Sequence, residues 1–221
     1  VIVAIDDFSL QQAANADLSQ DPLLQSLNQW PWPRRVHVKV LERLFEAGAS
    51  AVGFDLLFEA PSSHGADDDA AFARALRRYR DRVALGVQVL SGRGPVASMS
   101  LLDLTPALQP ADQSLNRGLL NGSPDPDGVI RRRPGHSAAE MRQHLGSSVP
   151  DGLAKTLLEL TNADINLNDE PLDLLDPYGP PGTIPTLSIW ELLDANAFLT
   201  IKKSGVLTDS MVLVGPTAAV F

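Results

Sequence analysis

Short apolar runs that alternate with helix-period segments dominate the first half of this chain. The runs Val1–Ile5, Ala51–Leu57 and Val83–Leu90 are rich in β-branched and other apolar side chains, as expected for strands buried on both faces. Between them, apolar residues recur at helical spacing over the segments 36–45 and 72–79. This order of strand, helix, strand, helix and strand predicts a doubly wound α/β fold with right-handed parallel crossovers.

The helix boundaries carry residues that suit them. Pro33 fits the start of the first long helix, and Gly48 is placed to cap its end. The second helix begins with the acidic run 67–69 and ends with arginines, which matches the helix dipole. A Ser-x-x-Gln pattern at Ser9 predicts a helical turn after the first strand. Residues 13–29 are polar with little pattern, so we expect a surface loop there.

The middle of the chain is less regular. Residues 118–121 and 129–133 are strand candidates on either side of the turn-forming segment 124–128, which predicts an antiparallel hairpin added to the sheet. A third helix is expected over residues 150–161, with its leucines inward, and a further strand over residues 172–176.

The last part of the chain carries one clear helix start and one strand. Ser188 and Glu191 form a capping-box pattern, with Leu187 and Leu192 placed as a hydrophobic staple. Met211–Gly215 is expected to close the sheet. The whole pattern predicts a single α/β domain over residues 1–221, with a doubly wound, mixed and mostly parallel sheet, helices on both faces and an added antiparallel hairpin.

Composition narrows the function classes. The chain of 221 residues has no cysteine, which excludes disulfides, thiolate metal sites and cysteine nucleophiles. Its formal charge of −9 argues against a nucleic-acid partner, since binding to nucleic acid needs cations that neutralise phosphates. No apolar window is long enough to span a membrane, and no signal peptide is recognisable. The apolar runs close to both ends suggest a domain cut from a longer protein.

Candidate chemistry gathers at the predicted strand ends and at the Trp-Pro-Trp-Pro-Arg segment 30–34. In open α/β sheets, ligands bind beyond the carboxyl ends of the strands. If the first two strands are neighbours, Asp6 and Asp55 converge on one crevice with aromatic walls, and Arg34 is aimed at one of them. Clustered carboxylates suit a hard cation or acid–base chemistry. The alternative is that these aspartates cap turns and that Arg34 neutralises one of them.

Two other segments have a chemical and a plain interpretation. The Asp-Pro-Asp-Gly segment 125–128 resembles the start of a calcium loop, but a hairpin turn explains it better because the remaining ligands are missing. The arginine run 131–133 has two interpretations, a phosphate site or a strand whose charged side chains face solvent. The histidines show no zinc spacing, and there is no phosphate-binding or nucleophile-elbow motif. No cofactor is therefore expected. The candidate ligand-binding residues are Asp6, Asp7, Ser9, Trp30, Trp32, Arg34, Asp55, Phe58, Asn121, Asp127 and Arg131.

Several of these residues also form an ordered set of motifs. They are Val3-Ala4-Ile5-Asp6-Asp7-x-Ser9-Leu10, Trp30-Pro31-Trp32-Pro33-Arg34, the Gly-Ala-x-x-x-x-Phe-Asp-x-x-Phe stretch that begins at Gly48, Asp125-x-Asp127-Gly128-x-x-Arg131-Arg132, Tyr178-Gly179-Pro180-Pro181-Gly182 and Val212-x-Val214-Gly215-x-Thr217-Ala218. In this order, and over essentially the whole chain, the set resembles the CHASE2 domain. The segment 11–28 is longer than the family pattern has before the tryptophans.

The resemblance implies an extracytoplasmic, periplasmic sensory domain of a bacterial inner-membrane receptor, without catalytic residues of its own. It implies flanking transmembrane helices in the full-length protein and a cytoplasmic adenylate or guanylate cyclase, histidine kinase, diguanylate cyclase or serine/threonine kinase. An unidentified small molecule or ion is the expected ligand, and a homodimer is expected because such output enzymes act in pairs. The alternatives are a metal-dependent hydrolase that uses Asp6, Asp7 and Asp55, and a ligand-free structural spacer or dimerisation domain whose pocket is filled by Trp30 and Trp32.

Overall fold

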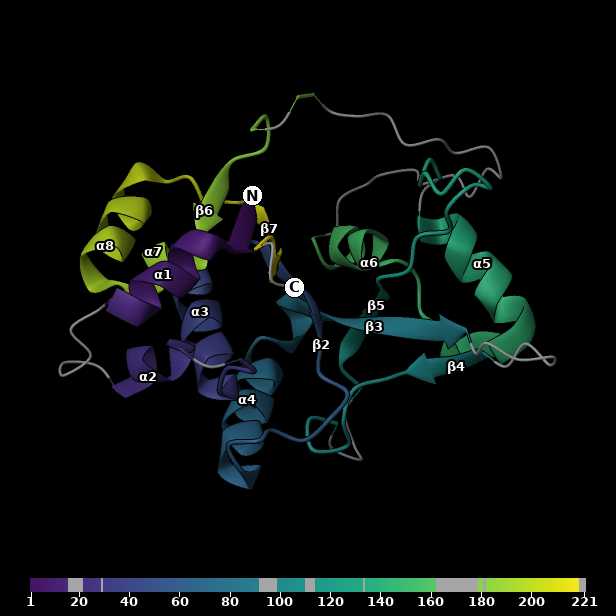
Figure 1. The fold of residues 1–221 in the computed structure, drawn as a ribbon, viewed down its shortest axis with the longest axis horizontal. Helices are drawn as coiled ribbons and strands as arrows, with labels where there is room; N and C mark the ends of the chain where they lie inside the picture. The colour runs from purple at the N-terminus through teal and green to yellow at the C-terminus, as the bar shows by residue number, and fades with distance from the viewer. Residues whose placement is uncertain are drawn as a thin grey trace.

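A mostly parallel sheet with helices on both faces forms the protein (Figure 1), which is a computed structural model. The structure describes residues 1–15, 22–28, 30–91, 99–109, 114–132, 134–161, 179–180 and 182–218. The strands are β1 (Ile2–Ile5), β2 (Ala51–Leu57), β3 (Val83–Ser91), β4 (Met99–Leu102), β5 (Asn116–Leu119), β6 (Thr186–Ser188) and β7 (Met211–Pro216). The helices are α1 (Asp7–Asn15), α2 (Pro22–Gln25), α3 (Arg34–Glu46), α4 (Ala66–Arg78), α5 (Pro134–Leu145), α6 (Leu153–Leu160), α7 (Ile189–Leu193) and α8 (Ala195–Ser204). The predicted fold class is confirmed.

The strand order is β4-β3-β2-β7-β1-β6, with β5 alongside β3. β7 pairs with both β1 and β2, and all these pairings are parallel. The condition that the first two strands are neighbours is therefore not met, and β7 lies inside the sheet instead of closing it at an edge. The crossover through α3 leaves a gap of one strand, and β7 fills it with Val212 and Val214, which are fully buried. The sequence reveals the strand but not its place in the sheet.

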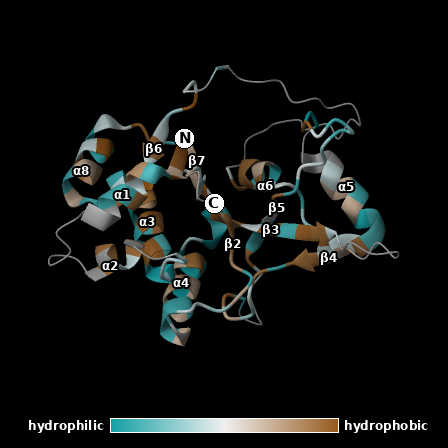
Figure 2. Ribbon diagram, in the orientation of Figure 1, coloured by the Kyte–Doolittle hydropathy of each residue, from teal (hydrophilic) through white to brown (hydrophobic). Residues whose placement is uncertain are grey.

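The main core lies on the face of the sheet that α3, α4, α7 and α8 cover. Val36, Val40 and Leu44 of α3 pack there with Phe54 of β2 and Phe72 of α4. This is the amphipathic stripe that the sequence predicts, and Figure 2 shows hydrophobic and hydrophilic residues interspersed along α3 and α4.

On the opposite face, α6 packs on β2, β3 and β5. Leu153 and Leu157 form a smaller core there, as the helix predicted over 150–161 requires. The helix approaches so closely that a Cβ atom at Gly118 would overlap Leu153. Glycine at this position therefore sets the helix-to-sheet distance.

The predicted hairpin is placed wrongly, although an antiparallel pair does exist. β5 covers part of its first strand but runs parallel to β3, and residues 129–132 are not a strand paired with it. The antiparallel partner is β4, which pairs with the second half of β3. Since β5 pairs with the first half of the same edge, no hydrogen-bonding positions remain there for a hairpin.

Other parts of the chain differ from the expectations or lie outside their test. Part of the predicted loop 13–29 is helical, as α1 extends to Asn15, α2 follows it, and a 3₁₀ turn (Ser26–Asn28) then places Leu27 in the core. The helix α5 has weak amphipathic patterning and was not expected. The strand predicted over 172–176 lies outside the described residues. Further 3₁₀ turns cover Arg80–Arg82 and Gly146–Ser148.

Candidate functional site

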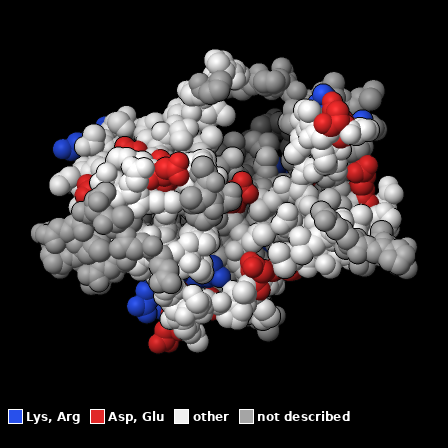
Figure 3. Space-filling view, in the orientation of Figure 1, with Lys and Arg blue, Asp and Glu red and all other residues white. Residues whose placement is uncertain are grey.

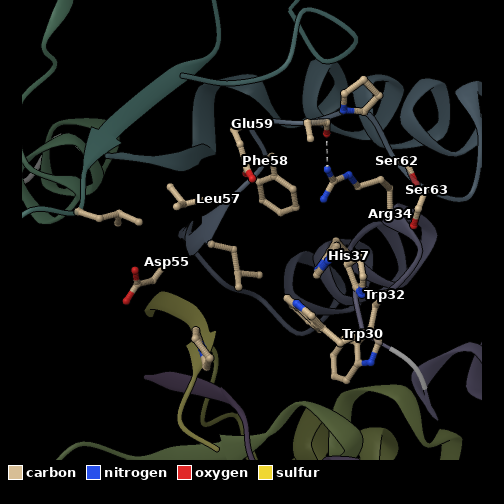
Figure 4. Close-up of a pocket in the computed structure, with 16 residues that line it drawn as sticks. Trp30, Trp32, Arg34, His37, Asp55, Leu57, Phe58, Glu59, Ser62 and Ser63 are labelled. Carbon is tan, nitrogen blue, oxygen red and sulfur yellow. Dashed lines mark hydrogen bonds between the residues drawn. The ribbon is translucent and has the colours of Figure 1, made fainter. Parts of the chain in front are cut away.

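A cleft of about 550 Å³ opens at the carboxyl end of β2. Its walls come from the segment before α3, the first turns of α3, the end of β2 with the loop after it, and the ends of β5 and β7 (Figure 4). The lining residues are Trp30, Pro31, Trp32, Arg34, His37, the segment 55–63, Leu120 and Pro216. Its size and mixed apolar and polar walls are those of a small-molecule site. Five predicted residues meet here: Trp30, Trp32, Arg34, Asp55 and Phe58.

The two tryptophans have different positions. Trp32 is 2% exposed, and its indole Nε1 donates a hydrogen bond of 2.9 Å to the carbonyl oxygen of Leu27. Trp30 is 43% exposed and meets the Trp32 ring edge-on, with 5.5 Å between the ring centroids. Trp32 thus anchors the segment, because its buried N–H is satisfied. Trp30 presents its indole to the cleft.

Arg34 is held within the protein. Its guanidinium donates from Nη2 to the Ala60 carbonyl oxygen at 2.9 Å, and Nε lies 3.5 Å from Oδ1 of Asp69. The same group lies 4.6 Å from the centre of the Phe58 ring. The side chain is 12% exposed. The prediction that Arg34 is aimed at Asp6 or Asp55 is wrong, because α4 packs against the start of α3 and supplies the carboxylate.

The acidic start of α4 caps another helix. Asp68 accepts hydrogen bonds from the backbone N–H groups of Arg34 and Arg35, at 2.6 and 3.1 Å. It also accepts from the Ser62 hydroxyl at 2.6 Å, and Asp69 accepts from the Ser62 backbone N–H at 2.8 Å. Both carboxylates are buried. The run 67–69 was predicted to cap its own helix, yet two of its members join α3, α4 and the loop beside the cleft.

His37 lines the cleft one helical turn after Arg34 and was not predicted as a site residue. Its ring is 2% exposed and lies among the rings of Phe54, Phe58 and Phe72, at 5.3 to 6.0 Å between centroids. Burial, together with the charge of Arg34, lowers the pKa of His37 to about 3. The imidazole is therefore neutral at pH 7. Its Nδ1 atom is buried and has no hydrogen-bond partner among the described residues.

Asp55 and Glu59 carry the remaining charges of the lining. Burial raises the pKa of the Asp55 carboxyl. Within the described part of the chain, neither carboxylate has a hydrogen bond or an ion pair, and both side chains lie on the Leu57 side of the cleft (Figure 4). These acids are thus available to a ligand.

Two predicted site residues form a helix cap instead, and a third lies in the helix that this cap starts. Asp6 Oδ1 accepts from the Ser9 backbone N–H at 2.8 Å, and Ser9 Oγ accepts from the Asp6 backbone N–H at 3.1 Å. This reciprocal pair starts α1, where the sequence suggested that Ser9 itself was the first capping residue. Ser188 Oγ also donates to Asp6 Oδ1 at 2.8 Å. Asp7 is exposed in the first turn of α1. None of the three lines the cleft.

The other three candidates lie elsewhere. Asn121 pairs with the backbone of Val89, accepting at Oδ1 and donating from Nδ2, at 2.7 and 2.9 Å. It therefore extends the edge pairing of β3. Arg131 forms a bidentate ion pair with Asp127 on the surface, at 2.8 and 2.7 Å, beside the turn that Gly128 closes. The turn interpretation of the 125–128 segment is confirmed.

The premise of a carboxylate metal site is not met. Asp6 and Asp55 do not end neighbouring strands, because β7 separates them. Among the residues that the structure describes, no three His, Asp or Glu side chains are close enough to hold a metal ion. Figure 3 shows acidic side chains scattered over the visible face, in keeping with the acidic composition.

Sequence reasoning missed His37, Glu59 and Pro216. His37 stands three residues after Arg34 within an otherwise apolar helix face, which is a signal for a shared site. Pro216 carries no such signal, because its place depends on the insertion of β7 next to β2.

One of the comparisons with known proteins identifies a family. The family model of the CHASE2 domain matches residues 1–221. No curated protein and no solved structure matches the chain. No helix in the described part of the chain has the length and apolar character needed to cross a membrane. Because the family match covers every residue, the chain belongs to the CHASE2 domain family, whose members are extracytoplasmic, non-catalytic sensory domains of signalling proteins.

Proposed function

We propose that this chain is the ligand-sensing domain of a bacterial membrane signalling protein, and that the cleft at the carboxyl end of β2 is its ligand site. The observation that carries the proposal is the position of Pro216. This residue lines the cleft and is also the last residue of β7. A ligand in the cleft would contact the strand that joins the two halves of the sheet.

The residues after Pro216 connect the cleft to β1. The backbone N–H groups of Thr217 and Ala218 both donate to the Ile5 carbonyl oxygen, at 2.9 and 3.0 Å. Ile5 is the last residue of β1 and precedes Asp6, which ties β1 to α1 and α7. A small shift of Pro216 therefore acts directly on the pairing of β1 with β7.

A ligand changes such an equilibrium only through a difference in its affinity for the two arrangements. Coupling free energies between sites are typically about 1–3 kcal/mol, or about 5- to 150-fold in affinity. Contacts with one strand end and one helix start are enough for an effect of this size. The open cleft favours a sensor over a ligand-free spacer, since Trp32 is buried and about 550 Å³ remains open beside it.

The setting of the domain is part of the proposal. We infer a periplasmic location, flanking transmembrane helices in the full-length protein, and a homodimer that matches a paired cytoplasmic cyclase or kinase. The family membership supports a sensory role outside the cytoplasm.

Filling the cleft tests the sensor role. Ser63 lines the cleft and is exposed, so Ser63→Trp reduces the open volume without removing a core contact. Leu199→Trp on α8 is the control, since Leu199 is 52% exposed and does not line the cleft. The output of the full-length protein in its membrane should change at least about 5-fold in Ser63→Trp. The control should retain the wild-type output. Equal outputs from folded Ser63→Trp and wild type would contradict the proposal.

A further inference from the structure

The charges around the cleft do not balance. Among the described residues of the lining, Arg34 is the single basic side chain, and Asp55 and Glu59 are the two acidic ones. The carboxylates of Asp69, Asp68 and Glu59 all act on Arg34. One guanidinium against four carboxylates leaves a formal charge of −3 for this group. The guanidinium already contacts Asp69, the Ala60 carbonyl oxygen and the Phe58 ring, although its buried Nε has no hydrogen-bond partner in the described part of the chain.

The acids that remain free face the open space. Asp55 and Glu59 form no hydrogen bond or ion pair within the described residues, and both contribute to the lining. Both residues are exposed at the rim of the cleft, and an unpaired carboxylate there favours any positive group that approaches it. Glu59 feels the charge of Arg34 without forming an ion pair with it, since the guanidinium of Arg34 is directed to Ala60 and Asp69.

Aromatic faces occupy the rest of the site. Trp30, Trp32 and Phe58 line the cleft, and Figure 4 shows the two indoles below the Phe58 ring with His37 between them. Indole and phenyl rings attract cations and also pack against apolar groups. An aromatic wall next to free carboxylates is the environment that a cation with an apolar body requires.

His37 provides an independent observation. Its imidazole is 2% exposed, lines the cleft and leaves Nδ1 without a hydrogen-bond partner in the described part of the chain. Buried polar atoms are rarely left unpaired without a functional reason. A neutral imidazole accepts a hydrogen bond at one ring nitrogen and places no positive charge beside an ammonium group.

We propose that the cleft binds an organic cation, namely an amine whose apolar body lies against Trp30, Trp32 and Phe58 and whose ammonium group is attracted by the acidic rim that Asp55 and Glu59 form. This inference rests on the proposed sensory function and names the ligand class of the same site. A cleft of about 550 Å³ suits a molecule of small-metabolite size.

Three compounds with the same apolar body test the charge preference. They are 2-phenylethylamine, which is cationic at pH 7, 2-phenylethanol, which is neutral, and 3-phenylpropionate, which is anionic. Each is titrated into the 221-residue chain and followed by tryptophan fluorescence and calorimetry. We expect saturable binding of the amine, roughly tenfold or more tighter than that of either other compound.

Isosteric variants then locate the contact. Asp55→Asn and Glu59→Gln should each weaken amine binding by roughly tenfold while leaving 2-phenylethanol binding unchanged. Asp127→Asn is the matched control, because Asp127 is a surface carboxylate outside the cleft. It should bind the amine as the wild type does. Circular dichroism confirms that each variant is folded.

Two results would overturn the inference. Tighter binding of 3-phenylpropionate would make the cleft an anion site that uses Arg34, and absence of saturable amine binding would exclude the cation. Neither result affects the sensory role if Ser63→Trp still changes the output of the full-length protein. If Ser63→Trp leaves the output unchanged, the sensory function fails, even where the amine binds.

Discussion

Oδ2 of Asp68, on α4, accepts a hydrogen bond of 2.6 Å from the backbone N–H of Arg34, the first residue of α3. The N-terminus of α3 is thus capped by a side chain from another helix, 34 residues further along the chain. Pro33 precedes α3 and has no side chain that caps it. The contact holds Arg34 and His37 in place on the wall of the cleft.

Removing this cap should destabilise the protein. Asp68→Asn takes the charge from a buried group that accepts three hydrogen bonds, so we expect the free energy of unfolding to fall by about 2–3 kcal/mol. Urea unfolding measures the change. Asp67→Asn is the control, because Asp67 is exposed in the same turn of α4, and it should cost less than about 0.5 kcal/mol. Equal losses in the two variants would show that Asp68 acts only through the helix dipole.

The two tryptophans should respond differently to truncation. Trp32→Ala removes a buried indole and should lower the free energy of unfolding by about 3–5 kcal/mol. Trp30→Ala removes a half-exposed ring and should cost about 1 kcal/mol or less. A spacer plugged by both rings would lose comparable stability in both variants. Thermal unfolding of the pair decides between these outcomes.

The neutral state of His37 should make stability depend on pH. Its pKa is about 3 in the folded protein and 6.5 when unperturbed. Between these values the unfolded chain binds a proton that the folded chain does not, so stability falls as the pH decreases through this window. The loss is at most about 1.4 kcal/mol per pH unit from this group. It should end below about pH 3, where both states are protonated.

Urea unfolding of the wild type and of His37→Gln at pH 7, 6 and 5 checks this contribution. Carboxylates titrate in both proteins, and the variant lacks only the imidazole. The slope of stability against pH should therefore be smaller in His37→Gln, whatever its absolute stability. Parallel slopes would mean that folding does not shift the pKa of His37.

Ser188 links two distant parts of the chain. Its hydroxyl donates to Asp6 at the end of β1, and its backbone N–H donates to Glu191 at the start of α7. Ser188→Ala should lower the free energy of unfolding by about 1–2 kcal/mol. In Ser148→Ala, which removes an exposed hydroxyl, the expected loss is below about 0.5 kcal/mol. An unchanged free energy of unfolding in Ser188→Ala would show that the Ser188 hydroxyl adds no net stability through the cap or the Asp6 contact.

The regular elements of the fold were predictable because their signals are local. The stripe of α3 and the apolar run of β2 depend on residues that are close in the sequence, and the observed bounds of β2 equal the predicted ones. The capping box at Ser188 is equally local. The hairpin error has the opposite origin, since the choice between β4 and residues 129–132 as the antiparallel partner depends on which edge of β3 is free.

The site was only half predictable. Trp30, Trp32 and Arg34 are adjacent in the sequence, and the strand-end rule added Asp55, so these residues were found together. Asp6 is also an aspartate at a strand end, but it exchanges hydrogen bonds with Ser9 in a helix cap. Residue type and position do not distinguish a free carboxylate from one that is hydrogen-bonded in a helix cap, because the hydrogen-bond partners are supplied by the folded chain.

The sequence alone determined the α/β class, the helices and strands with strong periodicity, and the family. Those properties follow from side-chain patterns within short segments and from ordered motifs. The tertiary structure decided that β7 enters between β1 and β2, that Asp68 caps α3, and that Arg34 turns to Asp69 while Asp55 and Glu59 stay free. These relations join residues far apart in the chain, and their energies depend on burial and charge pairing that exist only once the chain is folded.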